Sequence, residues 1–367
     1  MTDLVDSRTR DPRRPPPRRR LPKAVGIAVV LVVLVALLGS AALGARALLS
    51  SFSGGADDPD YTGAGTGEVL VQVADGDTAS DIALTLREKD VVKSAGAFRA
   101  VAAGDPRSRS VQPGFYRLRG QMSASDALAL LLDPEARARS RVTLPEGVTL
   151  AVALDRIADA TEVPEAQLQK AVAKAGPLGL PDYAGGQVEG FLYPATYDIE
   201  PGTSAAQALK TMVDRFGQAA SEIDLEGRAR ALGRTPYEVV ITASLIEKET
   251  AFAADRAKVA RVVYNRLDAG MPLQFDSTVN YIRTEKKARL STDDLKQESD
   301  YNTYQNTGLP PTPIDSPGTD ALEAALEPAK GDYVFFVTTA ENGSSLFTAD
   351  YDEFLRAKAK AKAEGIY

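Results

Sequence analysis

A run of 22 residues without a charged side chain, from Ala24 to Ala45, constrains this chain more than any other feature. A helix of that length extends about 33 Å at roughly 1.5 Å per residue, which matches the apolar core of a bilayer. Eight basic residues precede the run within residues 1–23, so the positive-inside rule predicts a cytoplasmic N-terminus. We therefore expect a cytoplasmic basic tail over residues 1–23, a single transmembrane helix over residues 24–45 and an extracytoplasmic body. A cleaved signal peptide is the alternative, although its apolar core normally has only about 7–15 residues.

The 367 residues include no cysteine and no histidine. Disulfides, thiol nucleophiles, cysteine-bound metal centres and Ser-His-Asp catalysis are therefore excluded, and the commonest metal ligand is missing. Acid–base chemistry has to come from Asp, Glu, Tyr or Lys. We expect no cofactor and no metal; a site built from carboxylates alone is an alternative that no cluster at ligand spacing favours.

Charge is distributed unevenly along the chain. Residues 1–23 carry a net charge of +5, whereas the formal total of −7 leaves −12 for residues 24–367. An acidic body argues against nucleic acid as its partner. The basic tail instead belongs with the apolar run beside it and indicates a membrane as the partner of the N-terminal region.

The body begins with a segment typical of a flexible linker, because Gly, Ser, Asp and Pro dominate residues 50–67. We expect that linker over residues 46–67. Two later stretches resemble each other, residues 71–103 and residues 142–174, and each predicts a strand, a turn and two helices.

A short strand pair is expected around residues 110–120, and a helix behind a Ser cap over residues 123–132. These patterns predict an α+β fold with a small domain over residues 68–137 and a larger domain over residues 138–367. The small domain has no residues of an obviously catalytic type, which leaves a spacer and a ligand-binding module as its two interpretations.

The segment Glu189–Tyr197 reads EGFLYPATY and places three aromatic residues and a Glu around Gly and Pro. Such a composition suits a rigid loop lining a groove, because the faces of Tyr and Phe stack well on sugars or peptides. It equally suits a buried turn, and the sequence alone leaves both interpretations open.

A helix with an acidic end follows further along the chain. Thr235 and Glu238 form a capping box around Pro236, which predicts a helix start. Residues 239–246 are apolar or small almost all the way round, so the helix should be buried. It then presents Glu-Lys-Glu at residues 247–249.

Burial and the negative end of the helix dipole both raise the pKa of a carboxyl group in that position, as a general acid requires. The helical wheel does not separate Glu247 from Glu249, and either could simply pair with Lys248, Arg256 or Lys258.

Two segments downstream add polar groups. The first predicts a helix from residue 255 that ends at Gly270, followed by a loop or strand that carries Gln274 and Asp276. The second, residues 299–318, has no regular period and is rich in Asn, Thr, Tyr, Pro and Gly. A loop of this length within a compact domain is usually functional or disordered, and its Tyr and Asn content favours a binding loop.

Five motifs occur in one order: EGFLYPATY (189–197), ASLIEKETA (243–251), VVYNRLDAGMPLQFDSTVNY (262–281), YNTYQNTGLPPTPIDSPG (301–318) and YVFFVT (333–338). In this combination the chain resembles the membrane-anchored endolytic murein transglycosylases of the YceG-like, or MltG, family. The resemblance extends from about residue 69 to the C-terminus and includes the single N-terminal span.

The resemblance implies cleavage of the β-1,4 bond between N-acetylmuramic acid and N-acetylglucosamine within peptidoglycan strands, leaving a 1,6-anhydromuramyl end. This is a lyase reaction that would terminate growing strands, beside peptidoglycan synthases as possible partners. It also implies that Glu249, the second Glu of E-K-E-T, is the acid and that the small domain is LysM-like and sugar-binding. The chain departs from the family where Ser344–Phe347 replaces a His-x-Phe element and where Gln274–Ser277 replaces Gln-Thr-Asp-Pro.

A reaction of this type needs only one carboxyl group, because the sugar's own C6 hydroxyl acts as nucleophile and is already held nearby. The resemblance makes Glu249 the expected catalytic residue. Two other classes remain as alternatives: a non-catalytic wall-binding or scaffold protein, and an ordinary hydrolase. The candidate substrate-binding residues, of which the three carboxylates could also tune Glu249, are Gln274, Asn265, Tyr304, Asn302, Glu247, Asp276, Glu189 and Tyr193.

Overall fold

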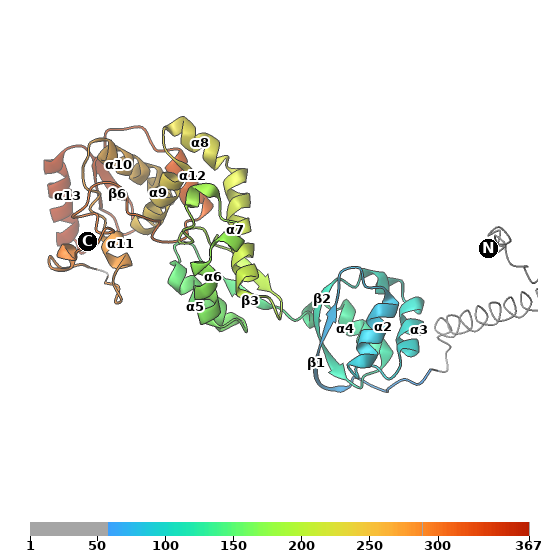
Figure 1. Cartoon of the computed structure of the whole chain (residues 1–367). Coiled ribbons are helices and arrows are strands. Elements are labelled where there is room, and N and C mark those ends of the chain that lie inside the picture. Colours follow the sequence, from blue (N-terminus) through green and yellow to red (C-terminus); the bar gives the residue numbers. More distant parts are fainter. Residues whose placement is uncertain (1–57, 288, 367) are drawn as a thin grey trace, which may run out of the picture. The chain divides into compact units, whose positions relative to one another are not determined.

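The computed structural model describes residues 58–287 and 289–366, which form a mixed α+β structure (Figure 1). The predicted basic tail, the predicted transmembrane helix and most of the predicted linker lie outside these residues. Within the described part of the chain, no helix is both long enough and apolar enough for a membrane crossing. The chain separates into two compact units, with the division between Ala136 and Arg137.

The first unit has the order strand, two helices, strand, helix. Its elements are β1 (Thr66–Val73), α2 (Ala79–Glu88), α3 (Ala95–Gly104), β2 (Gly114–Gly120) and α4 (Ala124–Leu132). Strands β1 and β2 pair antiparallel, with Val71 opposite Tyr116 and Val73 opposite Gly114. The helices cover this pair and bury one core with residues from all five elements, among them Val71, Leu86, Phe98, Tyr116, Leu118 and Leu128.

The prediction of a local strand pair at residues 110–120 is wrong. Only β2 forms there, because Pro106–Ser110 makes a turn of 3₁₀ helix and the partner of β2 is the distant β1. Tyr116 and Leu118 alternate inward on β2 and meet the inward valines of β1, so burial of the two apolar faces selects a long-range partner. The helix predicted behind Ser123 is confirmed, since Ser123 caps α4 through the N–H of Asp126.

The second unit is built mostly from helices, with two short strand pairs. Its elements are β3 (Ser140–Thr143), α5 (Leu150–Ala160), α6 (Glu165–Ala173), β4 (Thr196–Ile199), α7 (Ala205–Glu222), α8 (Leu225–Leu232), α9 (Pro236–Glu249), α10 (Arg256–Asp268), α11 (Asp276–Tyr281), α12 (Thr319–Leu326), β5 (Phe335–Thr338), β6 (Ser345–Thr348) and α13 (Tyr351–Ala363). The repeated strand–helix–helix pattern predicted for residues 142–174 is confirmed by β3, α5 and α6. Antiparallel pairs join β3 with β4 and β5 with β6.

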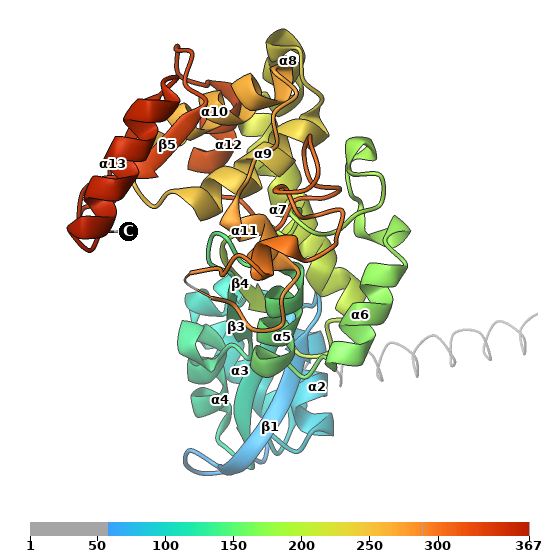
Figure 2. The same ribbon diagram turned by 90° about the vertical axis from the view of Figure 1, so that its left-hand side faces the viewer.

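Helix α9 is the central element of this unit, and α8, α10, α11 and α12 pack against it. Its predicted start is confirmed: the Thr235 hydroxyl accepts from the N–H of Glu238, while the Glu238 carboxylate accepts from the N–H of Thr235 at 2.7 Å. Every residue from Val239 to Ile246 is buried, as the apolar sequence predicts. In Figures 1 and 2, α13 and the β5–β6 hairpin lie at one edge of this unit.

The segment after α10 differs from its prediction. Residues 276–281 form the short helix α11 rather than a loop or strand. Gln274 adopts a left-handed backbone, with φ of 55°, and this ends the extended segment just before the helix starts. The predicted helix end at Gly270 is confirmed, because α10 stops at Asp268 and Gly270 has φ of 65°.

The loop of residues 299–318 contains no helix or strand, as predicted, yet it is held firmly against α9. The N–H of Ile314 donates to the buried Ser244 hydroxyl at 3.1 Å. Gly190 approaches the same loop so closely that a Cβ atom there would lie 2.5 Å from Pro313. With φ of 88° as well, position 190 requires glycine, and the segments 189–197 and 299–318 pack directly together.

Candidate active site

A cleft of about 370 Å³ opens beside the C-terminal end of α9 in the second unit. Helices α9 and α11, the loop of residues 299–318, the β5 strand and α13 all contribute to it. The residues that line it are Glu249, Arg266, Leu273, Gln274, Phe275, Asp276, Tyr304, Phe335, Phe336, Val337, Thr338, Tyr351, Phe354 and Lys358.

Glu249 is the last residue of α9, and its side chain is partly exposed in this cleft. Burial is the main cause of a pKa raised to about 7, because water that would solvate the charged carboxylate is excluded. The negative charge of Asp276 raises it further, whereas the Ser277 hydroxyl and backbone N–H lower it part of the way. A carboxyl group that exchanges its proton near neutral pH suits general acid catalysis.

The N-terminal end of α11 supplies the groups beside Glu249. Asp276 accepts a hydrogen bond of 2.5 Å from the Tyr304 hydroxyl, which ties α11 to the loop of residues 299–318. The Ser277 hydroxyl is buried and forms no hydrogen bond of regular geometry with the described residues. It nevertheless lies close enough to the Glu249 carboxyl to lower the pKa of that group.

Arg266 is a buried cation that holds the cleft together. Its guanidinium donates to the carbonyl oxygens of Val334 at 2.6 Å, Leu273 at 2.7 Å and Pro272 at 3.1 Å. Burial lowers the pKa of Arg266. These bonds join the segment before α11 to the start of the β5–β6 hairpin.

Four of the predicted site residues meet in the cleft: Glu249, Gln274, Asp276 and Tyr304. They come from three segments that are separated by up to 55 residues of sequence. The main-chain N–H of Gln274 donates to the Thr303 carbonyl at 2.9 Å, which fixes the extended backbone in front of α11.

Two predicted residues hold the backbone rather than line the cleft. The Asn265 amide donates to the carbonyl oxygens of Tyr333 at 2.9 Å and Gly331 at 3.2 Å. Asn302 is fully buried, and its amide donates to the carbonyl oxygens of Gln297 at 2.7 Å and Leu295 at 3.0 Å. Their predicted contacts with substrate stay a prediction.

Glu247 and Lys248 leave α9 in directions different from that of Glu249. The Glu247 carboxylate accepts from the N–H of Gly318 at 3.1 Å and lies 3.5 Å from the Arg256 guanidinium. Lys248 donates to the Gly147 carbonyl at 2.5 Å and lies 3.9 Å from Asp315. The structure thus distinguishes the two glutamates that the helical wheel leaves equivalent.

Asp315 is fully buried, and neither carboxyl oxygen has a hydrogen-bond partner among the described residues. Burial raises its pKa well above the ordinary value, and the nearby Lys248 opposes that effect. Asp315 therefore belongs to a buried polar cluster behind α9, away from the cleft lining.

Glu189 and Tyr193 belong to the segment EGFLYPATY, most of which is buried. Glu189 accepts from the Leu150 N–H and from the Tyr281 hydroxyl, both at 2.8 Å. Burial raises its pKa to about 7. The Tyr193 hydroxyl is bonded to Thr319 at 2.5 Å, and the Arg215 guanidinium lies over its ring. These contacts agree with a buried turn, which is one of the two interpretations of this segment.

Several cleft residues were not predicted to be site residues. Arg266 had a signal, because it continues the inward spacing of Val259, Val262 and Val263 on α10. Ser277, which acts on Glu249 from outside the cleft lining, had no signal beyond its place next to Asp276. The remaining unpredicted residues lie on β5 and α13, which reach the cleft only through the packing of the second unit. They are Phe335, Tyr351, Phe354 and Lys358.

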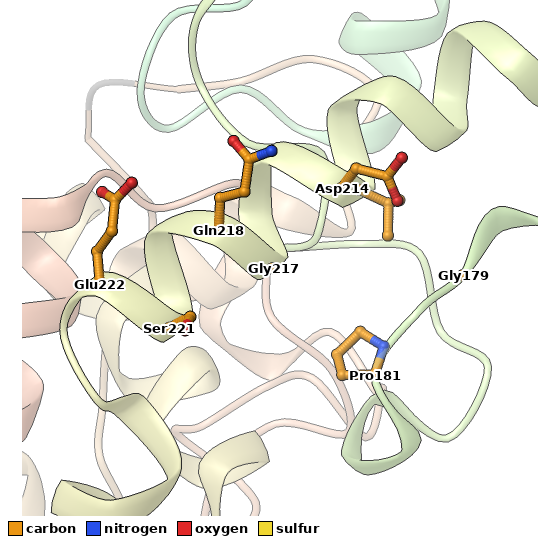
Figure 3. A pocket seen from close by; sticks show the side chains of 8 residues that line it. Gly179, Pro181, Asp214, Gly217, Gln218, Ser221 and Glu222 are labelled. Carbon is orange, nitrogen blue, oxygen red and sulfur yellow. The ribbon is translucent and has the colours of Figure 1, made fainter.

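A wider hollow of about 570 Å³ lies elsewhere in the second unit, along α7. Figure 3 shows Asp214, Gln218 and Glu222 projecting from one face of that helix, with Pro181 on the neighbouring loop. Its carboxylates pair at the surface, Asp214 with Lys210 and Glu222 with Arg215. Its size alone does not make this hollow a reaction site, because its acidic side chains are exposed and paired with basic residues.

Metal binding by acidic side chains has no support in the described ranges. Among residues 58–287 and 289–366, no three acidic side chains are grouped so that they could share a metal ion.

Comparison with known proteins agrees with the motifs. The sequence profile of the YceG-like family matches residues 71–360. The chain is 34% identical to an endolytic murein transglycosylase of Bacillus subtilis strain 168 over 310 residues, covering 80% of this chain and 84% of that protein. It is 30% identical to an endolytic murein transglycosylase of Streptococcus pneumoniae D39, covering 80% of this chain and 58% of that longer protein.

A solved structure has the same fold over most of its length. The crystal structure of a putative YceG-like protein from Listeria monocytogenes superimposes with a TM-score of 0.54 at 30% identity, covering 79% of this chain and 98% of the other. The family profile, the relatives and the fold agree, and the chain belongs to the YceG-like family.

Proposed function

We propose that this protein is an endolytic murein transglycosylase, with peptidoglycan glycan strands as its substrate and Glu249 as its general acid. The observation that carries the proposal is one carboxyl group, partly exposed in a cleft at the end of a buried helix, with a pKa near 7. The relatives that bear this name support the same reaction for the chain.

The reaction proceeds with a single carboxyl group. Protonated Glu249 gives its proton to the oxygen of the β-1,4 bond between N-acetylmuramic acid and N-acetylglucosamine. The bond from C1 of the muramyl sugar to that oxygen breaks, and positive charge develops at C1 and the ring oxygen. The N-acetylglucosamine unit leaves with a free hydroxyl group.

The same sugar then closes on itself. The C6 hydroxyl oxygen forms a bond to C1, and its proton passes to the Glu249 carboxylate, which restores the acid. The product is a 1,6-anhydromuramyl end, formed without water. The nucleophile is held within the substrate, so its effective concentration is high and a second carboxylate is unnecessary.

The residues around Glu249 assist in defined ways. Asp276 and Ser277 set the pKa of Glu249 in opposite directions. Gln274 and Tyr304 line the cleft and offer amide and hydroxyl groups to the acetamido and hydroxyl groups of the sugars.

The proposal includes the location of the protein at the membrane and the role of the first unit. An N-terminal span over residues 24–45 would hold the catalytic unit outside the cytoplasmic membrane, near newly made strands and the synthases that extend them. The first unit has the order strand, helix, helix, strand, with β1 and β2 antiparallel. This order supports a LysM-like glycan-binding role for the first unit.

The test is product analysis with the full-length chain in detergent and purified glycan strands. Mass spectrometry should find anhydromuramyl ends with the native chain and none with Glu249→Gln, a neutral side chain of nearly the same shape. Reducing ends in their place would identify a hydrolase. Binding of strands without any cleavage would support the scaffold alternative.

A further inference from the structure

Gln274 lies in the cleft with a backbone conformation that its residue type rarely adopts. Its φ is 55°, in the left-handed region, while its neighbours Leu273 and Phe275 are almost completely buried. Glycine adopts this conformation without strain, and other residues held there cluster at functional sites. The Gln274 side chain is exposed and lines the same cleft as Glu249. A glutamine in place of a glycine therefore indicates a use for that side chain.

The main chain around Gln274 is held on both sides. The N–H of Gln274 donates to the Thr303 carbonyl at 2.9 Å, and the N–H of Phe275 donates to the Thr303 hydroxyl at 3.0 Å. On the other side, the Arg266 guanidinium donates to the Leu273 carbonyl at 2.7 Å. These bonds fix the point from which the Gln274 side chain enters the cleft.

Arg266 also determines which way the Gln274 amide faces. A guanidinium nitrogen of Arg266 donates to the Oε1 atom of Gln274 at 3.4 Å. A guanidinium group carries donors and no acceptor, so it binds the amide oxygen and not the amide nitrogen. No described residue accepts a hydrogen bond from the Nε2 atom of Gln274. Both N–H groups of the amide therefore remain for a ligand in the cleft.

A neutral N–H donor binds a carbonyl oxygen of a ligand. Each amino sugar of an N-acetylated glycan strand carries such an oxygen in its 2-acetamido group. Removal of the acetyl group leaves an amine, which is an ammonium group at mildly acidic pH, and a donor of the ligand then faces the donors of Gln274. A site built to pair with a group of its substrate discriminates strongly against a ligand that leaves its polar atoms unpaired.

We propose that Gln274 makes this cleft selective for N-acetylated over N-deacetylated glycan strands. Its amide N–H groups donate to the acetamido carbonyl oxygen of a bound sugar, and Arg266 is the positioning residue that holds the amide in this orientation. The inference rests on the proposed function and deepens it, because it names the class of strand that is accepted and the class that is rejected. A reaction that removes acetyl groups from a strand would therefore protect that strand from cleavage.

The experiment lets acetylated and deacetylated sites compete within one substrate preparation. The full-length native chain in detergent is incubated at pH 6 with glycan strands in which part of the acetamido groups have been chemically deacetylated. Mass spectrometry counts the anhydromuramyl products that were cut beside acetylated and beside deacetylated sugars. The ratio of the two counts, corrected for the abundance of each site, is the selectivity. The native chain should prefer acetylated sites at least about tenfold.

Two substitutions change the donors of the amide. Gln274→Met keeps the length of the side chain without an N–H group and should lower the selectivity about three- to tenfold. Gln274→Glu replaces the donors with an acceptor that pairs with an ammonium group, so it should lower the selectivity at least about tenfold. Both kinds of site meet the same acid in each variant, so an altered pKa of Glu249 cancels in the ratio.

Two further substitutions test the geometry. Gln274→Gly suits a φ of 55° and should leave the unfolding temperature unchanged or raised, while the selectivity falls as in Gln274→Met. Arg266→Lys keeps the charge but loses the planar fork that orients the amide, so the selectivity should fall. Gln218→Met changes an exposed glutamine on α7, outside the cleft lining, and serves as the matched control. Circular dichroism verifies that each variant is folded.

The outcomes separate the selectivity from the proposed function. A native chain without preference, or a folded Gln274→Met variant with the native preference, would overturn the role of Gln274. Native selectivity in a folded Arg266→Lys variant would overturn its positioning role. Absence of anhydromuramyl ends with the native chain would overturn the proposed function instead. In that case, calorimetry of the Glu249→Gln chain with an N-acetylated chito-oligosaccharide tests the amide, since adding Gln274→Met should weaken binding about three- to tenfold and an unchanged affinity would refute its role.

Discussion

Two glutamates of the second unit, Glu249 and Glu189, share a pKa of about 7 for the same main reason, burial. Their surroundings differ. Glu249 ends a helix and opens into the cleft, whereas Glu189 accepts hydrogen bonds from Leu150 and Tyr281 and is 7% exposed. Both groups can hold a proton at neutral pH, but only Glu249 can hand that proton to a ligand. Shielding from water thus produces the acid, and access to the cleft gives it a function.

The largest expected effect is on cleavage. Glu249→Gln should reduce the rate at least about 10³-fold, because general acid catalysis is lost while shape is kept. Glu189→Gln should change the rate less than about tenfold, since its amide can still accept from Leu150. Release of anhydromuramyl ends from purified strands measures both variants. Similar losses in the two variants would show that access to the cleft does not distinguish these residues.

The next effect is on stability and concerns Glu189. Its pKa is raised from 4.5 to about 7 in the folded state, so the folded chain binds a proton that the unfolded chain releases over this range. The free energy of unfolding should therefore fall between pH 4.5 and 7, by roughly 3 kcal/mol from this group alone. Glu189→Gln should remove that part of the decline.

Urea denaturation of the native chain and the Glu189→Gln variant from pH 4.5 to 8 measures the difference. The difference between the two stability curves should grow from about pH 4.5 to about pH 7 and stay constant above that range. Parallel curves would mean that Glu189 is ionised in the folded chain, contrary to its burial.

The third prediction concerns the pH dependence of cleavage. Because the acid must be protonated, kcat/KM should be highest below pH 7 and should fall about tenfold per pH unit above it. Glu189→Gln should leave this decline in place. A rate that rises from pH 7 to 9 would indicate that the ionised form of Glu249 is required, and the acid role would be wrong.

The smallest effects come from the neighbours of Glu249. Asp276→Asn removes a negative charge and should move the decline in kcat/KM to lower pH, whereas Ser277→Ala removes a group that lowers the pKa and should move it to higher pH. Each change should alter the rate at pH 8 severalfold. Asp293→Asn makes the same charge change at an exposed position outside the cleft lining and serves as control. Shifts of both variants in one direction would contradict the environment described for Glu249.

Local patterns predicted much of the second unit. The capping box and the apolar run of α9, the end of α10 at Gly270 and the irregular loop of residues 299–318 were all expected and observed. Two predictions failed where the partner was distant or the backbone unusual: the strand pair at residues 110–120, and the loop or strand that is α11. Propensity and periodicity report only neighbouring residues, so neither reveals a β1–β2 pairing or a left-handed Gln274.

The sequence by itself determined that a buried helix ends in a pair of glutamates, and that no histidine or cysteine can share their chemistry. Tertiary structure alone turned Glu247 toward Gly318 and Arg256 and left Glu249 in the cleft. It also brought Asp276 and Ser277 beside Glu249 and placed aromatic residues of β5 and α13 in the same cleft. The physical reason is that a helix positions its residues by local hydrogen bonds, while the solvation and charge around a carboxyl group come from segments that meet only when the core packs.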